Sequence, residues 1–138
     1  MGDKGALRVE DLRSAYRAAF AAGLGGRLLA WLDDKLGGEA GDRVELLRYR
    51  GYARAAMLNY AGAAADLREV VSQRPHDVDA SHQLAVCLAR MGKVEEAVAK
   101  FVVIADTYRM RGSVRPAMAV YQRALRLTPM DTVVRSRL

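Results

Sequence analysis

The sequence predicts an all-α fold, a right-handed α-solenoid of about seven helices arranged as antiparallel helix-turn-helix pairs. Two observations support this prediction. Apolar residues recur every three or four positions, which is typical of amphipathic helices, and no segment shows the alternation of a strand. A spacing of 34 residues separates Ala63 from Ala97 and also Leu67 from Phe101. That period indicates units of two helices, which bury their apolar faces by stacking on one another.

The first four predicted helices are separated by glycine, proline or aspartate. They cover residues 9–22, 27–36, 43–58 and 61–73. In the second helix, Trp31 belongs to an apolar face that would pack the leading pair onto the rest of the chain or anchor a partner. In the third, one apolar stripe runs along the helix. It consists of Val44, Leu47, Gly51, Ala55 and Leu58.

The last three predicted helices cover residues 78–91, 94–111 and 115–127. No glycine or proline interrupts the stretch from Val94 to Met110, so we expect a single helix of about 26 Å there. Three short stretches each end one helix and offer an aspartate that caps or leads the next. They are Ala40-Gly41-Asp42, Pro75-His76-Asp77 and Pro129-Met130-Asp131.

The repeated positions resemble the tetratricopeptide repeat, which has large apolar, small and proline residues at fixed places. Counted from Val98, every signature position is filled. These positions are Phe101, Ile104, Ala105, Tyr108, Ala117, Tyr121, Ala124 and Pro129, with Gly112 at the turn. A frame that starts at Val44 is looser, because Arg50 and Arg54 stand where apolar residues are usual. A third frame starts at Val78 and overlaps the frame from Val98, so the helix near 94–111 would close one repeat and open the next.

The resemblance implies four segments. Residues 1–8 would be an N-terminal tail, and residues 9–42 a degenerate leading helix pair or cap. Residues 43–131 would hold the tetratricopeptide-like repeats. Residues 132–138 would be the start of a further helix or a C-terminal cap.

Composition and charge limit the function classes. The longest run free of charged residues, Ala55 to Ala65, is too short for a membrane span. A charged N-terminus and a single cysteine, Cys87, favour a cytoplasmic location. The formal charge is +6, and the basic surplus lies towards the C-terminus, which would favour an acidic partner surface.

The sequence predicts no enzyme, no cofactor and no metal site. Its two histidines, His76 and His82, lack the spacing to cysteine or carboxylate that a metal site needs. Cys87 is expected to be an inert core residue. Asp33 and Asp34 are adjacent on a helix and point to different faces, which suits solvent better than acid/base work.

The resemblance implies a partner-binding groove, lined by the first helix of each repeat. Carried over position by position, we expect eight residues in it. They are Arg48, Tyr52, His82, Val86, Arg90, Asp106, Arg109 and Met110. The Lys and Asn set that clamps a peptide carboxylate in some family members is absent from these positions. A co-chaperone role is therefore not implied.

These observations favour a non-catalytic scaffold or adaptor of bacterial type, which binds a partner peptide, helix or small protein in the groove. Two alternatives stay open. One is a chaperone for a secreted protein or a pilus or motility protein. The other is binding of nucleic acid or acidic lipid by the arginine-rich C-terminal third, although the aromatic residues of a nucleic-acid motif are not interleaved there. Whether the chain forms homo-oligomers also stays open.

Overall fold

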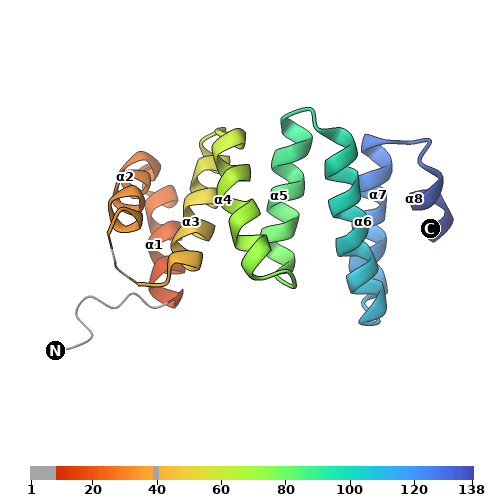
Figure 1. Ribbon diagram of the computed structural model, residues 1–138, viewed down its shortest axis with the longest axis horizontal. Helices are drawn as coiled ribbons and strands as arrows, with labels where there is room; N and C mark the ends of the chain where they lie inside the picture. Colours follow the sequence, from red (N-terminus) through yellow and green to blue (C-terminus); the bar gives the residue numbers. More distant parts are fainter. Residues whose placement is uncertain (1–8, 39–40) are drawn as a thin grey trace. The chain divides into compact units, whose positions relative to one another are not determined.

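The computed structural model describes residues 9–38 and 41–138, and over these residues the chain forms helices and no strands (Figure 1). In order, these are α1 (Val9–Ala21), α2 (Gly25–Leu36), α3 (Arg43–Ala56), α4 (Tyr60–Gln73), α5 (Val78–Arg90), α6 (Val94–Met110), α7 (Val114–Leu127) and α8 (Thr132–Arg137). The predicted all-α stack of helix pairs is confirmed, and each of the seven predicted helices is present. The eighth lies in the segment expected to begin a further helix or cap. The predicted tail 1–8 and Ala40 lie outside the described residues.

The helices fall into two compact units, which we describe separately. The N-terminal unit is Met1–Pro75, whose described part holds α1 to α4, and the C-terminal unit is His76–Leu138, with α5 to α8. Within each unit, helices that follow one another along the chain pack together. No described helix is long and apolar enough to cross a membrane.

In the N-terminal unit, α1 and α2 pack on α3 through one apolar cluster. The rings of Tyr16, Phe20 and Tyr52 and the indole of Trp31 surround it. Trp31 therefore serves to pack the leading pair, which is the first of the two roles expected for it. The buried members of the cluster are Leu12, Leu28, Leu32, Leu46, Tyr49 and Ala53.

Helices α3 and α4 approach each other closely at Gly51. A Cβ atom at this position would lie 2.9 Å from Cγ of Leu67, whose side chain is fully buried. Only a glycine leaves room for α4 at that distance. Ala63, also fully buried, lies on the same helix as Leu67 and keeps the two backbones near each other.

The aspartates expected at helix starts do cap them. The carboxylate of Asp42 accepts hydrogen bonds from the amides of Val44 and Glu45 at the start of α3. Asp77 accepts from Ala80 at the start of α5, and Asp131 does the same at the start of α8. These caps satisfy amides that have no partner inside the helix.

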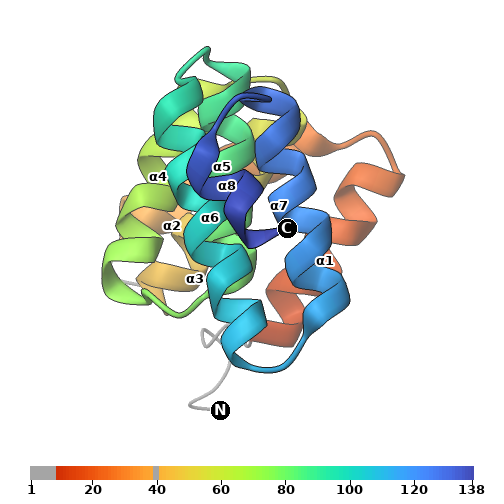
Figure 2. The same ribbon diagram turned by 90° about the vertical axis from the view of Figure 1, so that its right-hand side faces the viewer.

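In the C-terminal unit, α6 packs on α5 along one side and on α7 along another (Figures 1 and 2). Phe101 and Ala97 of α6 are buried, as is Tyr121 of α7. The prediction of one uninterrupted helix that serves two helix pairs is thus confirmed. The short α8 packs on α7, and its Val134 is fully buried.

Candidate partner-binding site

A pocket of about 320 Å³ opens in the C-terminal unit, where side chains of α5, α6 and α7 meet. It exists because α6 lies against both neighbours, so that the faces of α5 and α7 border one hollow. Its walls combine apolar and guanidinium groups. The lining residues are Val86, Ala89, Arg90, Phe101, Arg123, Arg126 and Leu127.

The apolar part of the pocket is built around Phe101. This side chain is only 1% exposed, because it lies four residues after Ala97 on the buried face of α6. Val86 and Ala89 of α5 and Leu127 of α7 are each partly buried beside it. An apolar side chain of a ligand would lose water against this surface.

Three arginines, Arg90, Arg123 and Arg126, supply all the charge of the pocket lining. Each is exposed. No aspartate or glutamate lines the pocket, and among the described residues none of the three forms an ion pair with a carboxylate. The guanidinium carbon of Arg123 lies 5.8 Å from the centroid of the Phe101 ring, a cation–π arrangement.

His82 of α5 forms a hydrogen bond with Arg123. Its Nε2 lies 3.1 Å from Nη1 of Arg123, and since a guanidinium only donates, Nε2 is the acceptor. The His82 ring also meets Phe101 edge to face at 5.6 Å. Burial, and then the positive charge of Arg123, lower the pKa of His82, and Asp79 opposes this only in part. The imidazole is therefore held in its neutral form, as the acceptor role requires.

The expected groove residues of the C-terminal unit separate into three groups. Val86 and Arg90 line the pocket, and His82 contacts two of its lining residues. Asp106, in contrast, accepts a hydrogen bond from the hydroxyl of Tyr121 and forms an ion pair at 2.9 Å with Nε of Arg137. It ties α6 to α7 and α8.

The other two expected residues of this unit, Arg109 and Met110, lie exposed in the last turn of α6. Neither is part of the pocket lining. Met110 is 86% exposed, which is unusual for a large apolar side chain.

Arg48 and Tyr52, also expected in the groove, belong to the N-terminal unit. Nε of Arg48 lies 3.2 Å from Oε1 of Glu45, and its Nη1 donates to the Tyr52 hydroxyl at 3.3 Å. The Tyr52 ring lies 6.3 Å from that of Tyr16 in α1. These side chains are engaged within their own unit, and their place in a partner-binding groove stays a prediction.

Sequence reasoning missed the contribution of α7 to the pocket. From the sequence, Arg123 and Arg126 belong only to the arginine-rich C-terminal third, and Leu127 belongs to no expected site. The available signal was their spacing, since positions three and four apart share one helix face. The spacing did not indicate that this face of α7 borders α5.

A buried carboxylate in the N-terminal unit was also missed. Asp66 of α4 is 4% exposed and is held by Arg50 and Arg54 of α3, at 2.8 and 3.1 Å. The exposed carboxylate of Asp33 in α2 also contacts Arg50, at 3.1 Å. The two arginines that loosened the repeat pattern are thus paired across helices. Their spacing of four residues indicated that both arginines lie on one face of α3. It did not indicate the acceptor, because Asp66 belongs to the next helix.

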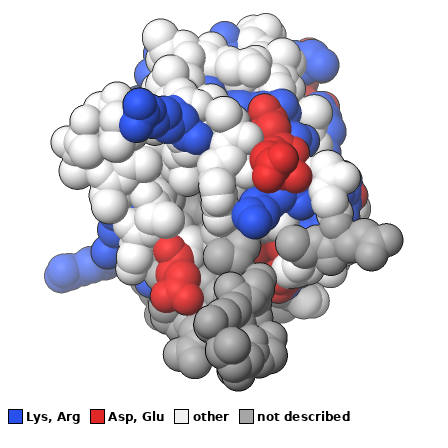
Figure 3. Space-filling model, turned by 90° about the vertical axis from the view of Figure 1, so that its left-hand side faces the viewer, with Lys and Arg blue, Asp and Glu red and all other residues white. Residues whose placement is uncertain are grey.

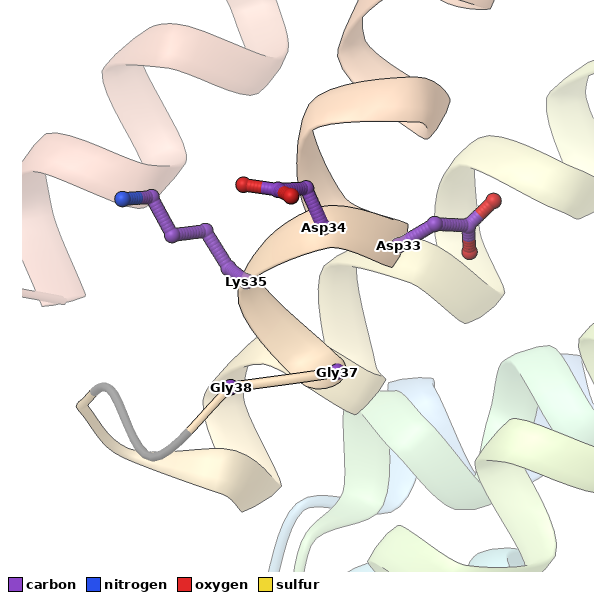
Figure 4. A pocket seen from close by; sticks show the side chains of 5 residues that line it. All are labelled: Asp33, Asp34, Lys35, Gly37 and Gly38. Carbon is purple, nitrogen blue, oxygen red and sulfur yellow. The ribbon is translucent and has the colours of Figure 1, made fainter.

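A second hollow, of about 550 Å³, lies at the end of α2 and is shown in Figure 4. The carboxylates of Asp33 and Asp34 point in different directions there, as expected for adjacent residues of a helix. They do not form a paired acid/base site.

On the face in Figure 3, acidic and basic side chains lie interspersed among uncharged ones.

Groups that could carry out chemistry are few in the described part of the chain. No cluster of three or more His, Cys, Asp or Glu residues there could hold a metal ion. Cys87 is fully buried on α5, and burial raises the pKa of its thiol, so the nucleophilic thiolate is disfavoured.

Part of the sequence of this chain matches a known family of proteins built from helix pairs. Residues 53–100, from the end of α3 to the first half of α6, match the tetratricopeptide repeat family. In that segment the resemblance seen in the sequence is confirmed. No curated protein matches the chain.

Two solved structures have a similar fold. One is "MamA 41-end from Desulfovibrio magneticus RS-1", with a TM-score of 0.55 and 18% identity, and the match covers 91% of this chain and 78% of that one. The other is "MamA RS-1 ArsTM double mutant", with a TM-score of 0.56, 17% identity and the same coverage of both chains. At these identities the similarity extends to the fold alone.

Proposed function

We propose that this chain, which carries a tetratricopeptide repeat at residues 53–100, is a non-catalytic module that holds a segment of a partner protein. Helical repeats of this kind typically act as scaffolds, because stacked helix pairs present an extended surface rather than a catalytic centre. The fold of the MamA structures is consistent with such a role.

The pocket of the C-terminal unit carries this proposal. Two of its lining residues, Val86 and Arg90, occupy α5 positions where tetratricopeptide repeats commonly meet their ligands. The hollow joins an apolar floor to polar groups at its edge, which is the usual build of a binding site. The exposed side chains of Arg109 and Met110 would extend the contact along α6.

The test is capture of a partner from the lysate of the source cells, with two variants that introduce the same charge. Val86→Asp places a carboxylate in the pocket wall, whereas Ala119→Asp places one at an exposed position of α7 outside the lining. We expect wild type and Ala119→Asp to retain the same discrete protein and Val86→Asp to lose it.

Circular dichroism must show that both variants remain folded, because Val86 is partly buried. The captured protein is then purified and its binding is measured directly. If no protein is retained, or if Val86→Asp retains it as well as wild type does, the pocket is not a partner-binding site.

A further inference from the structure

Resting on the proposed function, we infer that the pocket between α5, α6 and α7 is a subsite for an acidic residue of the partner, next to an apolar one. Its carboxylate would accept hydrogen bonds from Arg90 and Arg126. The neighbouring apolar side chain would pack on the partly buried apolar residues of the lining, Val86, Ala89 and Leu127.

The N-terminal unit shows how such arginines are satisfied when the chain supplies its own carboxylate. There Arg50 binds both oxygens of Asp66 through Nε and Nη2, at 2.9 and 2.8 Å. This two-point geometry is the one that guanidinium groups favour with carboxylates. In the C-terminal unit three arginines gather at one pocket with no such partner among the described residues.

The carboxylates of the C-terminal unit are committed elsewhere. Asp77 and Asp131 cap helices, and Asp106 pairs with Arg137. The other three belong to the first turns of α5 and α6, where the helix dipole favours negative charge. They are Asp79, Glu95 and Glu96. No side-chain carboxylate of this unit thus lines the pocket, which leaves its arginines available to a carboxylate of the partner.

The size of the pocket indicates side chains rather than a whole helix. Its volume of about 320 Å³ is at the lower end of ligand sites, which begin near about 300 Å³. One acidic and one apolar side chain would occupy such a space. Because Arg90, Arg123 and Arg126 are exposed at the pocket, an arriving carboxylate can reach their donors without a rearrangement of the helices.

The composition of the pocket favours an acidic protein segment over nucleic acid. Binding of single strands relies on exposed aromatic rings on which bases stack. The one aromatic residue of the lining, Phe101, is 1% exposed and is already covered by Arg123 and His82. An apolar floor beside guanidinium groups instead suits a peptide that carries acidic and apolar residues together.

The inference is tested with a fluorescein-labelled 12-residue peptide of alternating Glu and Leu, whose binding is followed by fluorescence anisotropy. The pocket variant is Arg90→Gln with Arg126→Gln, which breaks no ion pair within the described chain. The matched variant, Arg111→Gln with Arg115→Gln, removes the same charge at exposed positions outside the lining. We expect the Kd to rise at least about tenfold in the pocket variant and to change less than about twofold in the matched variant.

Three results would overturn the inference. The first is equal weakening by both variants, which would mean that only net charge matters. The second is equal binding of a control peptide in which Gln replaces Glu. The third is tighter binding of a 15-nucleotide oligothymidylate than of the acidic peptide, with the same loss on mutation of the pocket, which would assign the site to nucleic acid.

The outcome is separable from that of the proposed function. If the protein captured from the lysate is lost by Val86→Asp but binds the Arg90→Gln, Arg126→Gln variant as well as wild type, the acidic subsite is wrong and partner binding stands. If the acidic peptide binds in the pocket but no lysate protein depends on Val86, the anion site stands and the proposed function fails.

Discussion

Arg50 of α3 donates a hydrogen bond to each oxygen of the buried Asp66 carboxylate in α4, with Nε 2.9 Å from Oδ2 and Nη2 2.8 Å from Oδ1. Arg54, one turn further along α3, adds a contact of 3.1 Å to Oδ2. The α3–α4 pair therefore contains a charged cluster beside the close approach at Gly51. Hydrogen bonding to Asp66 raises the pKa of Arg50, so the guanidinium stays charged under all ordinary conditions.

We expect Asp66→Asn to lower the free energy of unfolding by about 2–4 kcal/mol, because it leaves two partly buried guanidinium groups with only the exposed carboxylate of Asp33 as counter-charge. Urea unfolding followed by circular dichroism measures this. The control is Glu69→Gln on the same helix, which loses only an exposed contact of 3.9 Å with Arg43 and should cost less than about 0.5 kcal/mol. A similar small effect for both variants would contradict a stabilising role of the cluster.

Gly51→Ala should destabilise the chain by up to about 2 kcal/mol, because the cost of overpacking exceeds the gain in helix propensity. The new Cβ would lie 2.9 Å from Cγ of the buried Leu67. Gly26→Ala in α2 is the matched control, since nothing lies within 4 Å of its Cβ, and it should be neutral or stabilising by up to about 1 kcal/mol. Thermal unfolding of both variants gives the comparison. A Gly51→Ala protein as stable as wild type would show that α4 can move away.

Asp106→Ala should lower stability by about 1–3 kcal/mol, because the buried Tyr121 hydroxyl loses its acceptor and Arg137 loses its ion pair. The exposed Glu95→Ala, at the start of the same helix, serves as control. Urea unfolding of both variants distinguishes a structural role of Asp106 from a role in partner binding. If Asp106→Ala changed partner binding without a change in stability, the structural role would be excluded.

The stability of the chain should depend on the protonation of His82. Burial and Arg123 lower the pKa of His82 below its ordinary value of 6.5. The unfolded chain then binds the proton more tightly, so this contribution to stability is complete above pH 6.5 and is lost as the pH falls through the lowered pKa. His82→Gln should flatten the dependence between about pH 7 and 5. An unchanged slope of unfolding free energy against pH in this variant would refute the assignment.

Cys87 should be inert in the folded chain. It is fully buried and burial raises the pKa of its thiol, so both access and thiolate formation are hindered. We expect a thiol reagent such as DTNB to react at least about 100-fold more slowly with the native protein than with the urea-unfolded protein. Reaction at the unfolded rate under native conditions would mean that α5 opens readily or that the thiol is exposed.

Much of the fold could be predicted because its signals are local. The spacing of apolar residues located the helices, and Asp42, Asp77 and Asp131 marked three of their starts. The absence of a helix breaker between Val94 and Met110 predicted the long α6. These features depend on residues within one or two turns of each other, so they can be predicted from the sequence alone.

The candidate site was predicted less well, because its residues meet across helices. Val86 and Arg90 could be selected from the resemblance to a repeat, whereas the sequence places Arg123 and Arg126 only within an arginine-rich C-terminal third. Such side chains carry long apolar stems that can lie against an apolar surface, so their position on a helix does not reveal what they approach.

The sequence by itself determined the helices, their caps and the repeat, since backbone geometry and apolar periodicity act over short distances. Only the tertiary structure decided which charges find a partner. It brought Arg50 to Asp66, 16 residues away, and placed Arg90 and Arg126 at one pocket without a carboxylate. The physical reason is that an ion pair depends on the distance between side-chain tips, which is set by how helices pack and not by the spacing along any one of them.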